Sequence, residues 1–140
     1  MSKLSVMLVL SAVLAFFSCV SRADEVHQAI DFGVVSYHVD EKSHFNNTNL
    51  GLGYERSIND RWSVSAGFYR NSIRNTSYYV APHYTIKKNF FLGADLGASV
   101  IVATGYHTPV LPIPEATLCW KYACAMTNVY VSSVGVRIPF

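Results

Sequence analysis

Apolar and polar residues alternate along most of the chain, and the alternation is clearest at its C-terminus. Every second residue from Val134 to Phe140 is large and apolar, while Ser133, Gly135 and Arg137 occupy the opposite face. A period of two is the period of a β-strand, and one apolar face beside one small or polar face indicates a strand between two different environments. The pattern predicts a final strand with one face on lipid and the other on a barrel interior.

The same alternation predicts strands upstream, over residues 26–37, 49–57, 61–70, 76–85 and 90–102. The connections alternate between long or intermediate loops (38–48, 71–75 and 104–115) and tight turns (58–60 and 87–89), as in transmembrane barrels. We therefore predict an all-β fold, a small antiparallel up-and-down transmembrane β-barrel of eight strands. The last 25 residues (116–140) must supply strands six to eight, where a spanning strand needs about 9–11 residues, so a seven-strand or soluble barrel stays open.

If the apolar faces meet lipid, the opposite faces carry ionisable groups into the barrel. These groups are Asp31, Glu55, Asp95 and Arg137. A charge at the centre of a bilayer costs about 2–4 kcal/mol, whereas opposite charges inside a barrel neutralise one another. We predict a lumen charge network in which Arg137 bridges Asp95, Glu55 or Asp31.

Inward glycines leave space for an acyl chain or simply let a small barrel close. Pro82 predicts a bulge or local opening in the fourth strand, because proline has no N–H to donate.

Residues 1–23 predict a secretory signal peptide. A short apolar run follows one positive charge, and Ser21 and Ala23 fit the small-x-small pattern before a cleavage site. The run is too short to span a bilayer as a helix. Cys19 leaves a lipoprotein as a minor alternative, because the residues before it make a poor attachment site. Residues 24–140 then form one barrel domain, and the predicted location is the bacterial outer membrane.

The charge of the chain and the spacing of its cysteines and histidines limit the partners and cofactors that we expect. The formal net charge is only +2 and the basic residues do not cluster, so nucleic acid is excluded as a partner. Cys119 and Cys124 predict a periplasmic disulfide, with two separate buried thiols as the alternative. No spacing predicts a metal site, and we expect no cofactor. The expected partners are membrane lipids (phospholipid and lipid A) and the barrel-assembly machinery during insertion, and the expected state is a monomer.

Candidate catalytic residues gather at one end of the predicted barrel. With the N-terminus in the periplasm, strands one, three and five run outward, so His38, Ser72 and His107 lie near the outer rim, and His44 lies in the first loop. A serine nucleophile needs a base within hydrogen-bond reach. Serine and asparagine are also ordinary turn residues, so a purely structural role is the alternative.

Several short segments together resemble a known family. They are Tyr37-His38, Gly51-Leu52-Gly53, Trp62, Gly67 to Ser72, Phe91 to Gly97, Thr104-Gly105-Tyr106, the proline-rich loop and the terminal aromatic strand. These segments resemble the lipid A palmitoyltransferase (PagP) family of eight-stranded outer-membrane barrels. The resemblance implies transfer of palmitate from a phospholipid to lipid A, with a hydrocarbon ruler inside the barrel. It maps the family's histidine to His38 and its serine to Ser72.

Two departures from the family pattern bear on the function. The family's aspartate falls on Asn71, which cannot act as a base or hold a negative charge, so the resemblance leaves it only a positioning role. The family's N-terminal amphipathic helix has no counterpart in residues 24–26. Three functions therefore remain: an acyltransferase, a non-enzymatic surface barrel whose loops 38–48 and 104–115 meet a partner or block access to one, and a soluble periplasmic barrel that binds a lipophilic ligand.

Overall fold

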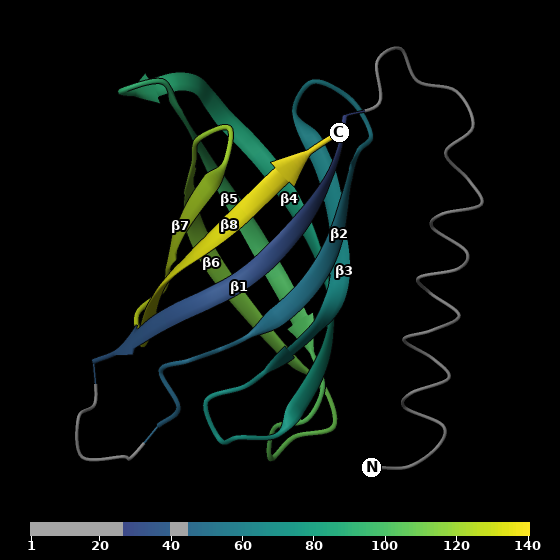
Figure 1. Ribbon diagram of the computed structural model, residues 1–140, viewed down its shortest axis with the longest axis vertical. Coiled ribbons are helices and arrows are strands. Elements are labelled where there is room, and N and C mark those ends of the chain that lie inside the picture. The colour runs from purple at the N-terminus through teal and green to yellow at the C-terminus, as the bar shows by residue number, and fades with distance from the viewer. Residues whose placement is uncertain (1–26, 40–44) are drawn as a thin grey trace.

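The computed structural model describes residues 27–39 and 45–140, so the predicted signal peptide lies outside the described residues. The described chain forms one closed antiparallel barrel, in which each strand pairs with the next and the first pairs with the last (Figure 1). The strands are β1 (Gln28–His38), β2 (Gly51–Ser57), β3 (Trp62–Arg70), β4 (Thr76–Phe91), β5 (Ala94–Ala103), β6 (Leu111–Cys119), β7 (Ala123–Thr127) and β8 (Val131–Pro139). The prediction of a small all-β barrel with eight strands is confirmed. Within the described residues, no helix has the length and apolar character needed to cross a membrane.

The alternation of side chains sorts them between the outside and the inside of the barrel. The outer surface carries large exposed apolar groups, including Phe32, Leu52, Phe68, Tyr78, Val100, Val136 and Ile138. The buried inner positions are mostly small, including Ala29, Ser63, Ser77, Ala81 and Ser99. An eight-stranded barrel has an interior only wide enough for side chains or one small ligand, so small inner residues leave a cavity.

A register shift in β1 decides which way the histidine faces. A regular strand would place Val35 on the inner face with Asp31 and would turn His38 outward. Instead the pairing of β1 with β8 slips by one residue between Gly33 and Val35. Beyond this shift Val35 is 53% exposed, whereas His38 is only 8% exposed. Regular alternation from Asp31 therefore gives the wrong face beyond Gly33, because one extra residue in a strand reverses every side chain after it.

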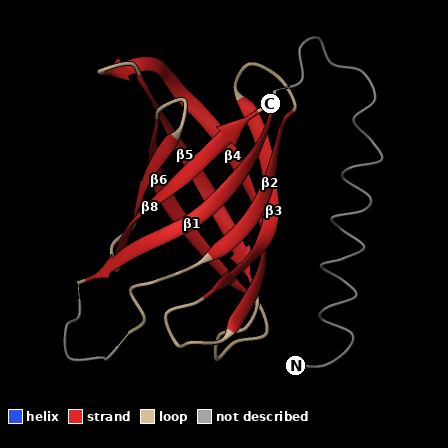
Figure 2. Ribbon diagram, viewed as in Figure 1, coloured by secondary structure: helices blue, strands red, loops and turns tan. Residues whose placement is uncertain are grey.

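The turn between β4 and β5 also differs from the prediction. The predicted turn at 87–89 is wrong, since β4 continues to Phe91 and the chain reverses at Leu92-Gly93. Both turn residues have positive φ (48° and 78°), as a primed two-residue hairpin turn requires. Asn89 also has positive φ (50°) and lies where the β4–β5 register is irregular. An asparagine tolerates this backbone in a strand irregularity as well as in a turn, so the sequence signal was ambiguous. Figure 2 shows the resulting hairpin projecting from the barrel.

Three of the four prolines that lie within strands, Pro82, Pro112 and Pro114, bear on the predicted connections. The predicted loop 104–115 ends earlier, because β6 begins at Leu111 and includes Pro112 and Pro114. Both prolines pair with β5, but β7 pairs with β6 only from Ala116 to Cys119. The wall between β6 and β7 is therefore unpaired beside the prolines, where a missing N–H costs little. The β4–β5 ladder is interrupted at 81–82 without a register change, which confirms the local opening expected at Pro82 rather than a bulge.

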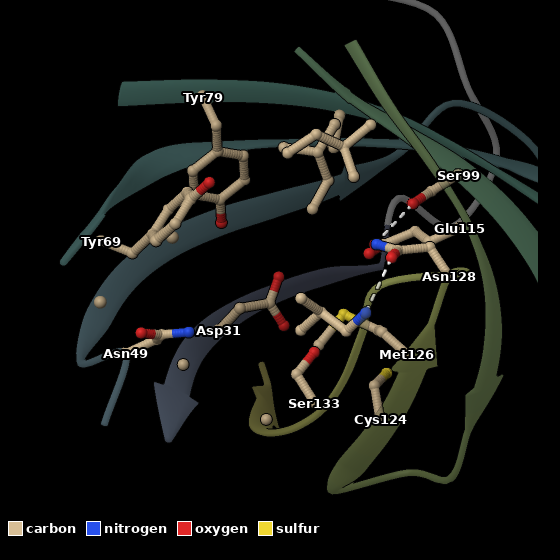
Figure 3. A pocket seen from close by; sticks show the side chains of 18 of the residues that line it. Asp31, Asn49, Tyr69, Tyr79, Ser99, Glu115, Cys124, Met126, Asn128 and Ser133 are labelled. Atoms are coloured by element: carbon tan, nitrogen blue, oxygen red, sulfur yellow. Dashed lines mark hydrogen bonds between the residues drawn. The ribbon is translucent and has the colours of Figure 1, made fainter. Parts of the chain in front are cut away.

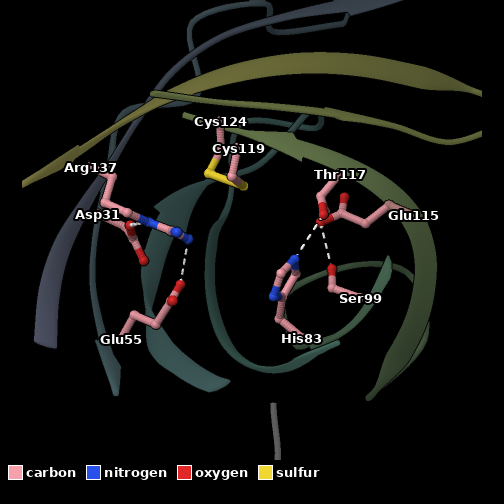
Figure 4. The surroundings of a disulfide bond; sticks show 9 residues. All are labelled: Asp31, Glu55, His83, Ser99, Glu115, Thr117, Cys119, Cys124 and Arg137. Atoms are coloured by element: carbon pink, nitrogen blue, oxygen red, sulfur yellow. Dashed lines mark hydrogen bonds and ion pairs between the residues drawn. A yellow bond between two sulfur atoms is a disulfide. The ribbon is translucent and has the colours of Figure 1, made fainter. Parts of the chain in front are cut away.

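The short C-terminal third does hold three strands, because β7 is only 5 residues long. Cys119 and Cys124 are direct register partners across β6 and β7, and a disulfide bond joins them, as predicted (Figure 4). β8 then pairs along nearly its whole length with β1 and closes the barrel.

Candidate functional site

The two rim residues predicted from the sequence meet in the structure. His38 ends β1 and Ser72 follows β3, and the His38 Nε2 lies 2.6 Å from the Ser72 Oγ. The other ring nitrogen, Nδ1, lies 2.8 Å from the Oδ1 of Asn47. A serine hydroxyl within hydrogen-bond reach of an imidazole is the arrangement of a nucleophile with its base.

The loop between β1 and β2 joins His38 to the serine. The backbone N–H of Asn46 donates to the carbonyl oxygen of Ser72 (2.8 Å), and the Asn46 side chain donates to the carbonyl oxygen of Thr48 (2.8 Å). The ring of Phe45 packs against the His38 imidazole, with ring centres 4.8 Å apart. Residues 45–49 are therefore docked on the serine loop and cover one face of the histidine.

Asn71 stabilises the loop that carries Ser72 through hydrogen bonds of both its side-chain oxygen and its side-chain nitrogen. It is fully buried (0% exposed). Its Oδ1 accepts from the backbone N–H groups of Ile73 (3.1 Å) and Asn75 (2.9 Å). Its Nδ2 donates to the Oγ of Ser77 (2.9 Å) and to the carbonyl oxygen of Gly105 (3.0 Å). Asn71 therefore shapes the turn that presents Ser72, and its hydrogen bonds do not include His38.

Inside the barrel, next to His38 and Ser72, lies a cavity of about 780 Å³. The large apolar or aromatic side chains that line it include Tyr69, Tyr79, Ile101, Leu111, Ile113 and Met126. Figure 3 shows three of them, Tyr69, Tyr79 and Met126, among the side chains around the cavity. His107 lines the same cavity, whereas His44 lies outside the described residues. Ser72 therefore stands at the entrance of a chamber that suits an apolar chain.

A second set of side chains that line the cavity is polar, and Figure 4 shows it around the disulfide bond. The guanidinium of Arg137 contacts the carboxylates of Asp31 (3.2 Å) and Glu55 (2.5 Å). Nearby, the His83 Nε2 lies 2.8 Å from the Thr117 Oγ1, and the Ser99 hydroxyl donates to the Glu115 carboxylate (2.9 Å). These paired groups form the floor of the apolar chamber.

The predicted charge network is present, but with two acids in place of three. Asp31 is the direct register partner of Arg137 on the neighbouring strand, and Glu55 reaches it from β2. Asp95 instead accepts a hydrogen bond from the backbone N–H of Asn89 (2.8 Å). Its placement in the network was wrong, because the carboxylate serves the extended β4–β5 hairpin.

Sequence reasoning missed three residues of the site, which are Phe45, Asn47 and Tyr106. The first two lie in a polar stretch whose composition indicates only a loop. Tyr106 lies in the β5–β6 loop, and its hydroxyl is 2.9 Å from that of Tyr69. Burial raises the pKa of the Tyr106 phenol above its ordinary value, so the phenol stays protonated and keeps this hydrogen bond. Only contacts made in the folded barrel, with His38 on β1 and Tyr69 on β3, distinguish these residues from their neighbours.

Within the described residues, no group of three or more His, Cys, Asp or Glu side chains could hold a metal ion. In comparisons with protein-family models and with curated proteins, nothing matched this chain.

Proposed function

We propose that the protein spans the outer membrane of a bacterium as a barrel. The exposed apolar side chains around the barrel support this proposal, because hydrocarbon accepts them at no cost whereas water does not. The predicted signal peptide supports export. Fractionation of cells checks the location, and we expect the protein in the membrane pellet after an alkaline wash. Recovery in the soluble periplasmic fraction would favour the lipophile-binding soluble barrel instead.

We further propose that the barrel is an acyltransferase that moves an acyl chain from a phospholipid to lipid A. The observation that carries the proposal is the hydrogen bond between His38 and Ser72 at the entrance of the apolar chamber. The Ser72 Oγ attacks the phospholipid ester carbonyl while its proton passes to the His38 Nε2. That proton then leaves with the glycerol oxygen as the ester bond breaks. An acceptor hydroxyl of lipid A next gives its proton to the His38 Nε2 and takes the acyl group from the serine. As the bond between the acyl carbon and the Ser72 Oγ breaks, that proton passes from His38 to the Ser72 Oγ.

The chamber would hold the acyl chain during transfer. Its apolar part begins beside Ser72 and ends at the ion pairs of Arg137, which an alkyl chain does not displace because unpaired buried charges are costly. The unpaired wall between β6 and β7 offers a route for the chain from the bilayer into the barrel. The depth of the chamber therefore limits the length of the chain transferred.

Replacement of the nucleophile tests the proposed chemistry. We expect Ser72→Ala to reduce acyl transfer at least about a hundredfold, because the attacking oxygen is lost. The measurement uses folded protein in detergent micelles with radiolabelled phosphatidylethanolamine and lipid A, followed by chromatography. Ser132→Ala is the matched control, since this exposed serine bonds Thr127 and not His38. A wild type that transfers nothing would leave the non-enzymatic surface barrel as the function.

Filling the chamber tests where the chain lies. Ala81 is buried on the inner face of β4 and lines the cavity. We expect Ala81→Met to shift transfer toward shorter acyl chains without unfolding the barrel, because the larger side chain occupies the path to the floor. Competition among phospholipids of different acyl length, read by mass spectrometry of the modified lipid A, measures the shift. Ala98→Met, at an exposed position of β5, should leave the preference unchanged.

A further inference from the structure

We propose that Asn47 is the positioning residue of the site, and that Ser72, His38 and Asn47 act as a hydrogen-bonded relay. The inference rests on the proposed function and assigns a role to a residue that neither the alternation nor the family resemblance pointed to. Asn47 accepts from one nitrogen of His38 (2.8 Å) while Ser72 bonds the other (2.6 Å), so the histidine links the two side chains.

The chemistry of an amide oxygen determines the state of the histidine. The Asn47 Oδ1 carries no hydrogen, so it can only accept, and the His38 Nδ1 must therefore hold a proton. A neutral imidazole has one ring proton, which leaves its Nε2 bare and facing Ser72. That nitrogen then accepts the hydrogen bond of the serine hydroxyl, as a base must. Without Asn47 the ring is free to protonate Nε2, and the histidine would then donate to the serine.

The backbone around Asn47 supports this positioning. Its carbonyl oxygen accepts from the Ser36 N–H on β1 (2.8 Å), and the N–H of Asn46 bonds the Ser72 carbonyl oxygen (2.8 Å). One short segment thus ties the strand that carries the base to the loop that carries the nucleophile. Because these bonds are made by the backbone, a change of the Asn47 side chain leaves them in place. The orienting effect can therefore be removed without removing the scaffold.

Asn71 does not compete for this role. It lies at the position where the resemblance expects an aspartate, but its four hydrogen bonds go to the serine loop, Ser77 and Gly105. In this chain, support of the nucleophile and orientation of the base thus come from two asparagines on two different loops.

A fluorophosphonate probe tests the relay without any lipid substrate. It reacts with an activated serine and gives separate constants for reversible binding and for covalent modification, with mass spectrometry locating the adduct. We expect the wild type to be labelled at Ser72. We expect Asn47→Ala to lower the modification rate constant about 10- to 100-fold with little change in reversible binding, as for other residues that orient a histidine. Asn47→Asp should stay within about threefold of the wild type, because a carboxylate also accepts from Nδ1.

Thr48→Ala is the matched control, an exposed neighbour in the same segment, and should label like the wild type. Asn47→Ala labelling at the wild-type rate would overturn the relay while leaving the proposed function intact. An unlabelled wild-type Ser72 would instead count against the proposed function. In that event, ¹⁵N shifts of the His38 ring still decide the inference. A wild-type ring protonated mainly at Nδ1 and an Asn47→Ala ring of mixed tautomers support it, whereas a wild-type ring protonated mainly at Nε2 overturns it.

Discussion

Replacing Asn71 with aspartate should destabilise the protein by about 2–4 kcal/mol and lower acyl transfer, although it recreates the residue that the family resemblance expects. The Asn71 Nδ2 donates to the Gly105 carbonyl oxygen, and a carboxylate would set two acceptors against each other there. The new charge would be fully buried among hydrogen bonds built for an amide. Because Asn71 shapes the turn that presents Ser72, loss of these bonds displaces the nucleophile from His38.

Urea unfolding in detergent micelles, followed by tryptophan fluorescence, measures the stability, and the lipid assay measures transfer. Asn59→Asp is the matched control, because the Asn59 side chain in an exposed turn only accepts, from the N–H groups of Arg61 and Trp62 (both 2.9 Å). A carboxylate keeps both bonds, so this variant should unfold close to the wild type. An Asn71→Asp protein as stable as the control and more active than the wild type would show that Asn71 is a substituted catalytic acid.

Arg137→Met should cost about 2–4 kcal/mol of stability, because it leaves Asp31 and Glu55 facing each other in the lumen without their shared cation. Each carboxylate contacts the guanidinium directly, at 3.2 Å and 2.5 Å. The side chain of Arg137 is 20% exposed, so water in the cavity moderates the repulsion and keeps the cost below that of a dry ion pair.

Urea unfolding again gives the measurement, and a compensating variant identifies the cause. Arg137→Met combined with Asp31→Asn and Glu55→Gln should recover most of the lost stability, because no unpaired charge remains. If the combined variant were as unstable as Arg137→Met alone, packing of the arginine stem rather than charge would account for the loss. If Arg137→Met matched the wild type, the network would contribute nothing to folding.

Much of the fold followed from local patterns. The period-two alternation predicted every strand up to residue 102 to within a few residues, apart from the boundary between β4 and β5. It also placed Asp31, Glu55 and Arg137 on inner faces, where opposite charges in a narrow lumen have few partners but one another. The cysteine pair was predictable because two thiols so close in an exported hairpin are commonly register partners.

The predicted connections were wrong where the same residues are compatible with either a turn or a strand. Lys87 to Asn89 is polar enough for a turn, but it lies in a strand irregularity because the Leu92-Gly93 reversal follows it. Pro112 and Pro114 are residues typical of a loop, yet they pair with β5. Strand β6 tolerates them because β7 does not pair with this part of its opposite edge. Whether an edge is paired depends on the neighbouring strand and not on the proline itself.

Local patterns of residues were enough to predict a barrel with an apolar outside, a charged lumen, and a histidine and a serine at one rim. The contact between these two residues could be seen only in the folded chain. The extra residue between Gly33 and Val35 turns His38 inward, and no composition marks it, because a bulge is set by pairing with β8. The Asn71 side chain bonds the Gly105 carbonyl oxygen in a loop two strands away, and the Asn47 side chain bonds His38 across the connection between β1 and β2. Both contacts depend on how the folded chain places strand ends and loops together, and not on any local preference of asparagine.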